Sequence, residues 1–307
     1  MSAIALAQSA VCPASHAHAL FLSMDLRPNA TRQDARHVLH VASQALDAWR
    51  KHHEASRACW AIGIGSEDWG ILGDALRPSE LASFPQFADA AFPNPHTPHA
   101  LFLHLRSERH DLCFEAGQIA EVALEACFTV AESVAGFRYL DSRDLTGFVD
   151  GTENPELGER PDVALIDEPG MYAGGSYLHV QRYVHDLHKW QHTPVATQEH
   201  VIGRTKVDDI ELSDDEKPDN AHIARVVIEE DGEELAIVRQ SLPYGNIGGE
   251  QGLFFVSYCK TPTTFAKMLA RMMTKRDGHS DNLLHFTRAA TGAAYFVPPR
   301  AWFDKPA

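Results

Sequence analysis

The sequence of 307 residues contains little cysteine and no Cys-x-x-Cys pair. Its five cysteines are scattered singly, which excludes a paired-cysteine zinc or redox site, and an odd number cannot close entirely into intramolecular disulfides. Basic residues are also scarce: 27 lysines and arginines stand against 42 aspartates and glutamates, a formal net charge of −15. Because this charge repels phosphate backbones and anionic lipids, we expect no nucleic-acid or membrane partner.

Long apolar runs and an N-terminal positive charge are missing as well. No run approaches the roughly 20 residues of a membrane-spanning helix, and no lysine or arginine precedes Arg27, so a secretory or twin-arginine signal is not expected. We therefore expect a cytoplasmic protein, consistent with the reducing compartment that unpaired cysteines indicate. The chain is 44% hydrophobic and long enough for two domains.

Apolar patterning in the first half alternates between short strand-like runs and helical spacing. Amphipathic helices are expected at about 38–49 and 112–126. The expected strands are 18–26, 58–65, 99–106 and 134–140. The resulting order, β-α-β-β-α-β, is that of a ferredoxin-like unit.

The second half repeats this order. Helices are expected at about 196–205 and 262–275, the latter with Thr261 as N-cap and Pro262 in its first turn. The expected strands are about 175–184, 234–240, 252–259 and 293–297. We predict an α+β fold of two duplicated ferredoxin-like domains with antiparallel sheets, residues 1–145 and 146–307.

Three residues of the second half could serve redox chemistry. Asp150 lies in a glycine-flanked turn, His222 precedes an apolar run, and Arg239 follows one. Each alone has an ordinary explanation, as a turn residue, one of 18 histidines or a cation at a sheet edge. Together they offer an iron ligand, a proton-transferring carboxylate and a permanent cation, the groups that a haem peroxidase needs.

The segments around these residues resemble the dye-decolorising peroxidase family. Residues 147–151 match its G-x-x-D-G signature and residues 152–155 match the usual extension. Further segments resemble the family in its order, namely 175–183, 201–206, the region of His222, 239–245, 252–255 and 281–287. The resemblance covers most of the chain and is closest to the short cytoplasmic bacterial members.

This resemblance implies one haem b per chain, bound in the C-terminal half. His222 would be the proximal iron ligand, with Asp281 accepting from its other ring nitrogen. Asp150 and Arg239 would form the distal pair. The other residues expected at the haem are Arg204, as a propionate partner, and Gly151, Thr152, Ser241, Leu253 and Phe255, with Ser241 facing the distal pocket.

The implied chemistry accounts for these residue types. A carboxylate such as Asp150 can take a proton from one oxygen of hydrogen peroxide and return it to the oxygen that leaves. A guanidinium such as Arg239 stabilises the charge that builds up as the O–O bond breaks heterolytically to give a ferryl intermediate. Small organic reductants, dye-like or phenolic, then supply two electrons. We expect Arg239 to outweigh burial in setting the pKa of Asp150, so that peroxide activation persists into acid solution.

Other interpretations remain open. The same pocket could serve haem storage or deferrochelatase-like iron release, but storage needs His222 and neither distal group, so the presence of both favours peroxide chemistry. A haem-free α+β interaction protein is the third hypothesis. The histidines at 185, 188 and 192 are expected to form a solvated face, and tryptophans and tyrosines could relay electrons or simply pack. We also expect a homo-oligomer, and no C-terminal extension that would direct the chain into a protein shell.

Overall fold

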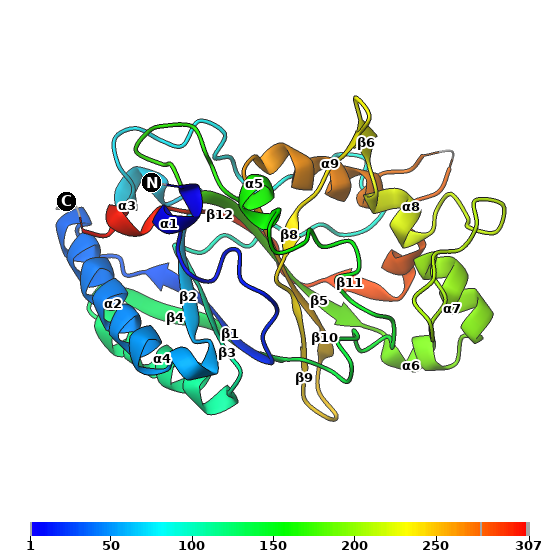
Figure 1. Ribbon diagram of the computed structural model, residues 1–307, viewed down its shortest axis with the longest axis horizontal. Helices are drawn as coiled ribbons and strands as arrows, with labels where there is room; N and C mark the ends of the chain where they lie inside the picture. Colours follow the sequence, from blue (N-terminus) through cyan, green and yellow to red (C-terminus); the bar gives the residue numbers. More distant parts are fainter. Residues whose placement is uncertain (1, 277, 305–307) are drawn as a thin grey trace.

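The strands of both halves of the chain join in one sheet that closes on itself (Figure 1). The computed structural model describes residues 2–276 and 278–304. Residues 305–307, at the C-terminal end where no extension is expected, lie outside the described residues. Within this part of the chain the sheet runs β11-β5-β12-β2-β3-β1-β4-β9-β10-β8, and β10 also pairs with β5. That last pairing closes the eight strands from β5 to β10 into a barrel, and every strand pairing in it is antiparallel.

The first half follows the predicted order. Its strands are β1 (His18–Leu26), β2 (Cys59–Gly65), β3 (Leu101–Ser107) and β4 (Phe128–Phe137), and its long helices are α2 (Arg32–His52) and α4 (His110–Leu124). The strands lie in the order β2-β3-β1-β4. β4 ends before the predicted residue 140 because Leu140 and Ser142 have φ values of 46° and 70°, which a strand cannot accommodate.

The second half has the equivalent strand order, β9-β10-β5-β12. Its elements are β5 (Ser176–His185), α6 (Leu187–Gln191), α7 (Val195–Ile202), α8 (His222–Val226), β8 (Val238–Arg239), β9 (Leu242–Gly245), β10 (Gln251–Cys259), α9 (Pro262–Met273), β11 (Thr287–Ala289) and β12 (Ala293–Val297). As predicted, the Thr261 side chain caps α9, accepting from the N–H of Thr263. The shorter elements are α1 (Ala3–Leu6), η1 (Glu54–Ser56), α3 (Trp69–Leu72), α5 (Arg160–Ala164), β6 (Glu229–Glu230), β7 (Glu233–Glu234), η2 (Asn282–His285) and η3 (Arg300–Trp302).

The predicted strand at 234–240 is wrong for most of its length. Only Val238 and Arg239 pair with β10, and the following strand β9 was not predicted. Residues 235–237 line a cavity instead of joining the sheet. Side chains that form the wall of a cavity are apolar, so a run of them has the same sequence pattern as a buried strand.

Helices cover the outside of the barrel on two sides (Figure 1). In that view α2 and α4 lie at the left, α6, α7 and α8 lie at the right, and α9 runs along the top. None of the described helices has the length and hydropathy to cross a bilayer. All five cysteines are free and buried. The fold is a mixed α/β structure with antiparallel strands.

Aromatic side chains fill the barrel interior. Phe254 on β10 is 1% exposed and stacks on Phe21 of β1 with ring centroids 4.2 Å apart. Phe102 of β3 lies beside both rings. Because β1 and β3 belong to the first half and β10 to the second, this stack joins the two halves.

We expect Phe254→Ala to lower the free energy of unfolding by about 3–5 kcal/mol, since the cavity it leaves is enclosed by rigid strands. Phe114→Ala is the matched control, because Phe114 is 58% exposed and should change stability by no more than about 0.5 kcal/mol. Urea denaturation of both variants measures the difference. Equal losses would show that the stack does not hold the halves together.

Candidate active site

A deep cavity lies between the β5–β10 sheet and helices α8 and α9. It holds about 1400 Å³ of empty space, its open mouth included. The apolar side chains on its walls come mainly from β10, α8, α9 and the run at 235–237. This apolar lining, with a few polar groups from separate elements, is typical of a cofactor or ligand site.

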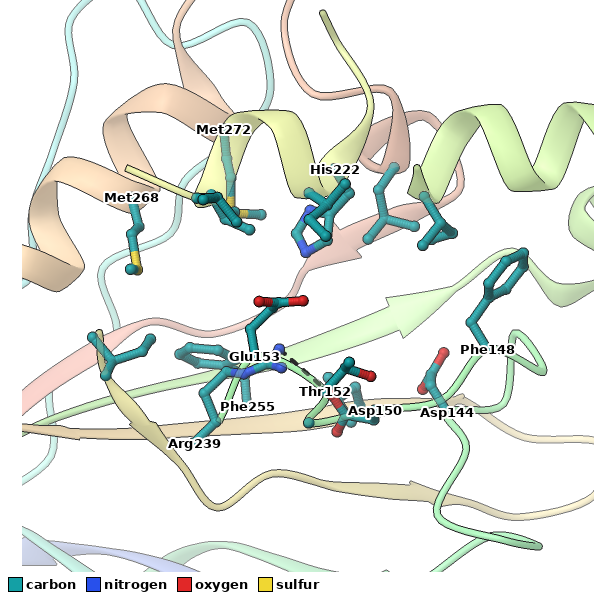
Figure 2. Close-up of a pocket in the computed structure, with 18 of the residues that line it drawn as sticks. Asp144, Phe148, Asp150, Thr152, Glu153, His222, Arg239, Phe255, Met268 and Met272 are labelled. Carbon is teal, nitrogen blue, oxygen red and sulfur yellow. Dashed lines mark ion pairs between the residues drawn. The ribbon is translucent and has the colours of Figure 1, made fainter. Parts of the chain in front are cut away.

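His222 projects into the cavity from α8 (Figure 2). Its Nδ1 lies 2.7 Å from Oδ2 of Asp281, which is fully buried and whose Oδ1 also accepts from the N–H of Leu283. A carboxylate can only accept, so Nδ1 carries the hydrogen, and in the neutral ring Nε2 then presents a lone pair. This arrangement fixes the tautomer and orientation that a metal-binding imidazole requires.

Asp150 and Arg239 lie on the opposite side of the cavity from His222 (Figure 2). Arg239 Nη1 is 3.5 Å from Asp150 Oδ1. Asn154 positions the arginine, because its side-chain amide exchanges two hydrogen bonds of 2.8 Å with the backbone N–H and C=O of Arg239. The turn that carries Asp150 is thereby fastened to the strand that carries Arg239.

Burial raises the pKa of Asp150 above its ordinary value. Arg239 opposes this shift without cancelling it, and the nearby carboxylate of Asp144 adds to it. The prediction that Arg239 outweighs burial is therefore wrong. The reason is that Arg239 meets Asp150 at 3.5 Å through one nitrogen rather than through a close two-bond contact.

If Asp150 takes a proton from peroxide, as the sequence resemblance implies, its raised pKa predicts a loss of peroxide reactivity in acid. Only the ionised carboxylate can take a proton from peroxide, so the rate should fall as pH decreases, with a midpoint above the ordinary value of about 3.9. Stopped-flow rates at a series of pH values measure this, with Asp150→Asn as the control that lacks the transition. A wild-type rate that stays constant down to about pH 4 would contradict the assignment.

Arg204 lines the same cavity but is engaged by acidic groups. Its guanidinium contacts the Glu153 carboxylate at 2.5 Å, the Asp209 carbonyl at 2.7 Å and the Glu211 carboxylate at 3.8 Å. The Thr152 hydroxyl donates to Asp209 at 2.6 Å. These groups form an acidic rim around one arginine.

The remaining predicted residues divide into two groups. Gly151, Leu253 and Phe255 line the cavity. Ser241 does not line it in the described part of the chain. Its Oγ accepts from the backbone N–H of Val256 at 3.1 Å, and its expected place on the distal side stays a prediction.

The two family models of Dyp-type peroxidases match this chain almost from end to end, the N-terminal model over residues 8–138 and the C-terminal model over residues 141–302. The chain belongs to the Dyp-type peroxidase family. It is accordingly a haem-dependent peroxidase, an oxidoreductase.

Several relatives in this family are closely similar to the chain. It is 44% identical over 250 residues to a dye-decolorizing peroxidase of Mycobacterium tuberculosis, covering 80% of this chain and 74% of that protein. A dye-decolorizing peroxidase of Rhodococcus erythropolis is 42% identical over 250 residues, covering 80% and 73%.

Solved structures agree with these matches. The encapsulated DyP-type peroxidase of Mycobacterium smegmatis superposes with a TM-score of 0.92 at 38% identity, covering 98% of each chain. A variant of Rhodococcus jostii RHA1 DypB in complex with haem superposes with a TM-score of 0.91 at 37% identity, covering 98% of this chain and 99% of that one.

The cavity of this Dyp-type peroxidase fits the haem that the family requires. A flat apolar macrocycle needs apolar walls, and Leu253, Phe255 and Met268 supply part of them. An iron ion needs an imidazole nitrogen aimed at it, and the hydrogen bond from Nδ1 to the Asp281 carboxylate fixes the orientation of the His222 ring. The donor set and the lining therefore agree with haem binding.

Sequence reasoning missed two polar residues of this Dyp-type peroxidase site. Asp144 and His185 both line the cavity and lie 3.1 Å apart. The prediction of a solvated face is wrong for His185, which ends β5 with its side chain 6% exposed. His188 and His192 lie in or next to the separate helix α6 and are exposed. Among the described residues no group of three or more His, Cys, Asp or Glu side chains could hold a metal ion.

Proposed function

We propose that the chain cleaves hydrogen peroxide heterolytically on one haem b held by His222, with Asp150 and Arg239 acting on the peroxide. Small organic reductants, dye-like or phenolic, would supply the electrons. The observation that carries the proposal is the pair of Asp150 and Arg239 facing His222 across an apolar cavity (Figure 2). A bound haem supplies the redox chemistry, and the chain supplies position, protons and charge.

Asp150 would move the proton. As a carboxylate it accepts the proton of one peroxide oxygen, and as the acid it donates that proton to the other oxygen, which leaves as water. Its raised pKa suits both halves of this task, because a stronger base accepts more readily and the neutral acid is not disfavoured by burial.

Arg239 would stabilise the negative charge that builds up on the leaving oxygen. Its backbone is held by Asn154 and its Nη1 lies 3.5 Å from Asp150, so the guanidinium is already at the cavity wall when the charge develops. A guanidinium does not lose its proton in the working pH range, so this stabilisation persists while Asp150 titrates.

Arg204 would bind a haem propionate, supported by Gly151 and Thr152 in the same part of the cavity wall. The Glu153 carboxylate contacts the Arg204 guanidinium at 2.5 Å, so a haem propionate would have to compete with Glu153 for this arginine. Asp281 would strengthen His222 as a ligand through the 2.7 Å hydrogen bond.

Haem storage and iron release are less well supported. Haem storage requires the ligand His222. It does not require the Asp150 carboxylate and the Arg239 guanidinium, which lie together on the opposite wall. Membership of the Dyp-type peroxidase family also favours turnover over storage.

The larger organisation is part of the same proposal. We propose two duplicated ferredoxin-like domains, residues 1–145 and 146–307, since strand orders β2-β3-β1-β4 and β9-β10-β5-β12 are equivalent. We also propose a cytoplasmic homo-oligomer. The buried free cysteines suit a reducing compartment.

Steady-state oxidation of a phenol and of a dye by the haem-loaded protein tests the function. We expect oxidation that depends on both peroxide and haem, and its loss in the double variant Asp150→Ala, Arg239→Ala, which still binds haem. A wild-type protein that binds haem stoichiometrically but oxidises neither reductant would instead support storage.

A further inference from the structure

His185 is held in the cavity by two polar partners that the mechanism above does not use. Its Nε2 lies 3.1 Å from Asp144 Oδ1, and its Nδ1 lies 2.8 Å from Thr287 Oγ1. All three residues line the cavity. Figure 2 shows Asp144 on the same side as Asp150.

The carboxylate of Asp144 is ionised. Burial alone would raise its pKa, but His185 and the hydrogen bonds from the Thr146 N–H and hydroxyl lower it to about 2. An ionised carboxylate only accepts, so Nε2 of His185 must carry a hydrogen. The state of Nδ1 then decides whether the ring is neutral or positive.

Thr287 can serve either state of that nitrogen. Its hydroxyl oxygen lies 2.8 Å from His185 Nδ1 and 3.3 Å from the Val184 carbonyl. When Nδ1 is bare, the hydroxyl donates to it. When Nδ1 is protonated, it donates to Thr287, whose hydroxyl turns to the Val184 carbonyl. His185 can therefore gain or lose a proton without leaving a buried polar atom unpaired.

The peroxidase reaction needs a proton source of this kind. Reducing one peroxide to two waters consumes two electrons and two protons. Asp150 returns to the leaving oxygen only the proton it took, so the second water must obtain its protons elsewhere. A reductant that carries no proton supplies electrons alone.

Two other groups on the wall are poorer donors. Asp144 is ionised, and burial raises the pKa of Tyr183, whose hydroxyl donates to Gln181. The groups that act electrostatically on Asp150 are Arg239 from β8, Asp144 from its own turn and His222 from α8. The ion pair of His185 is with Asp144, at 3.1 Å.

We propose that His185 stores a proton and delivers it to the cavity during the reductive half of the cycle. Asp144 holds the positive charge, and Thr287 switches its hydroxyl between two acceptors. With each of the two electrons, one proton passes from Nδ1 through the Thr287 hydroxyl and cavity water to the oxygen that leaves as the second water, and His185 regains a proton from solvent after each delivery. This inference rests on the proposed function.

The test is reduction of the peroxide-treated, haem-loaded protein by hexacyanoferrate(II), which donates one electron and no proton. For the wild type we expect a rate that falls as pH rises and that slows in D₂O. His185→Gln should be about tenfold slower or worse at acid pH and should lose the pH dependence.

Two substitutions of Thr287 separate proton transfer from packing. Thr287→Val keeps the volume and removes the hydroxyl, and it should resemble His185→Gln. Thr287→Ser loses a methyl group but keeps the hydroxyl, and it should resemble the wild type. If serine is as slow as valine, the effect is one of packing and the proposal is wrong.

A spectroscopic measurement is independent of turnover. In the diamagnetic ferrous carbon monoxide form with ¹⁵N-labelled histidine, the resonance absent from His185→Gln should titrate, and Asp144→Asn should move that titration to lower pH. A His185 resonance that does not titrate between about pH 5 and 8 would overturn the proposal. If the wild type does not react with peroxide at all, the proposed function itself fails.

Discussion

Arg239→Ala is expected to slow the reaction of the haem-loaded protein with hydrogen peroxide by about 10²- to 10³-fold, the usual cost of removing one fixed group that stabilises developing charge. Asn154 bonds only to the backbone of Arg239, and alanine keeps those two hydrogen bonds. The variant therefore keeps the local fold and loses only the charged side chain. The second-order rate constant from stopped-flow absorbance measures it.

Two control variants define the cause of that loss. Arg239→Lys keeps a positive charge but not the planar donor, and it should recover only part of the rate. Arg288→Ala removes an arginine that is 61% exposed and paired with Glu250, and it should leave the rate unchanged. A rate equal to wild type in Arg239→Ala would remove this residue from the mechanism.

His222→Ala is expected to abolish the stable haem complex, because the variant loses the imidazole that presents Nε2 to the cavity. Asp281→Asn should have a smaller effect, a 10- to 100-fold loss of haem affinity or activity, which is typical of the outer partner of a metal-binding histidine. Titration of the apoprotein with haem, followed by the Soret band, gives both affinities.

His188→Ala is the matched control for this series, because His188 lies on α6 with its side chain exposed. Its haem titration should match that of the wild type. Undiminished haem binding in His222→Ala would assign the iron ligand to another residue.

The sequence was sufficient for elements whose continuous apolar run has clear polar ends. In the first half, β1 spans the predicted 18–26 because its apolar run is bounded by polar residues. Residues 234–240 could not be predicted in the same way, since apolar side chains that face a cavity look like those that face a sheet. The closure of the barrel by β5 and β10 depends on pairing between distant residues, which local patterns do not encode.

Some residues of the candidate site could be predicted from local sequence, and others are brought together only by the fold. Asp150 stands within a recognisable signature, whereas Asp144 and His185 lie 41 residues apart and are joined only by the fold. The direction of the Asp150 pKa shift was also beyond the sequence, because it depends on how deeply the carboxyl is buried and on the 3.5 Å separation from Arg239. The hydrogen bond that the Ser241 hydroxyl accepts from the backbone of β10 likewise depends on the fold and not on a local pattern.

The most direct test of the central claim compares peroxide mixing for the haem-loaded wild type, Asp150→Ala and Arg239→Ala. If Asp150 moves the proton and Arg239 stabilises the charge, the wild type should show a rapid change of the Soret band. At least one single variant should then be slower by about 10²-fold or more. Equal rates in all three proteins would contradict the account, even though the fold and the haem would remain as described.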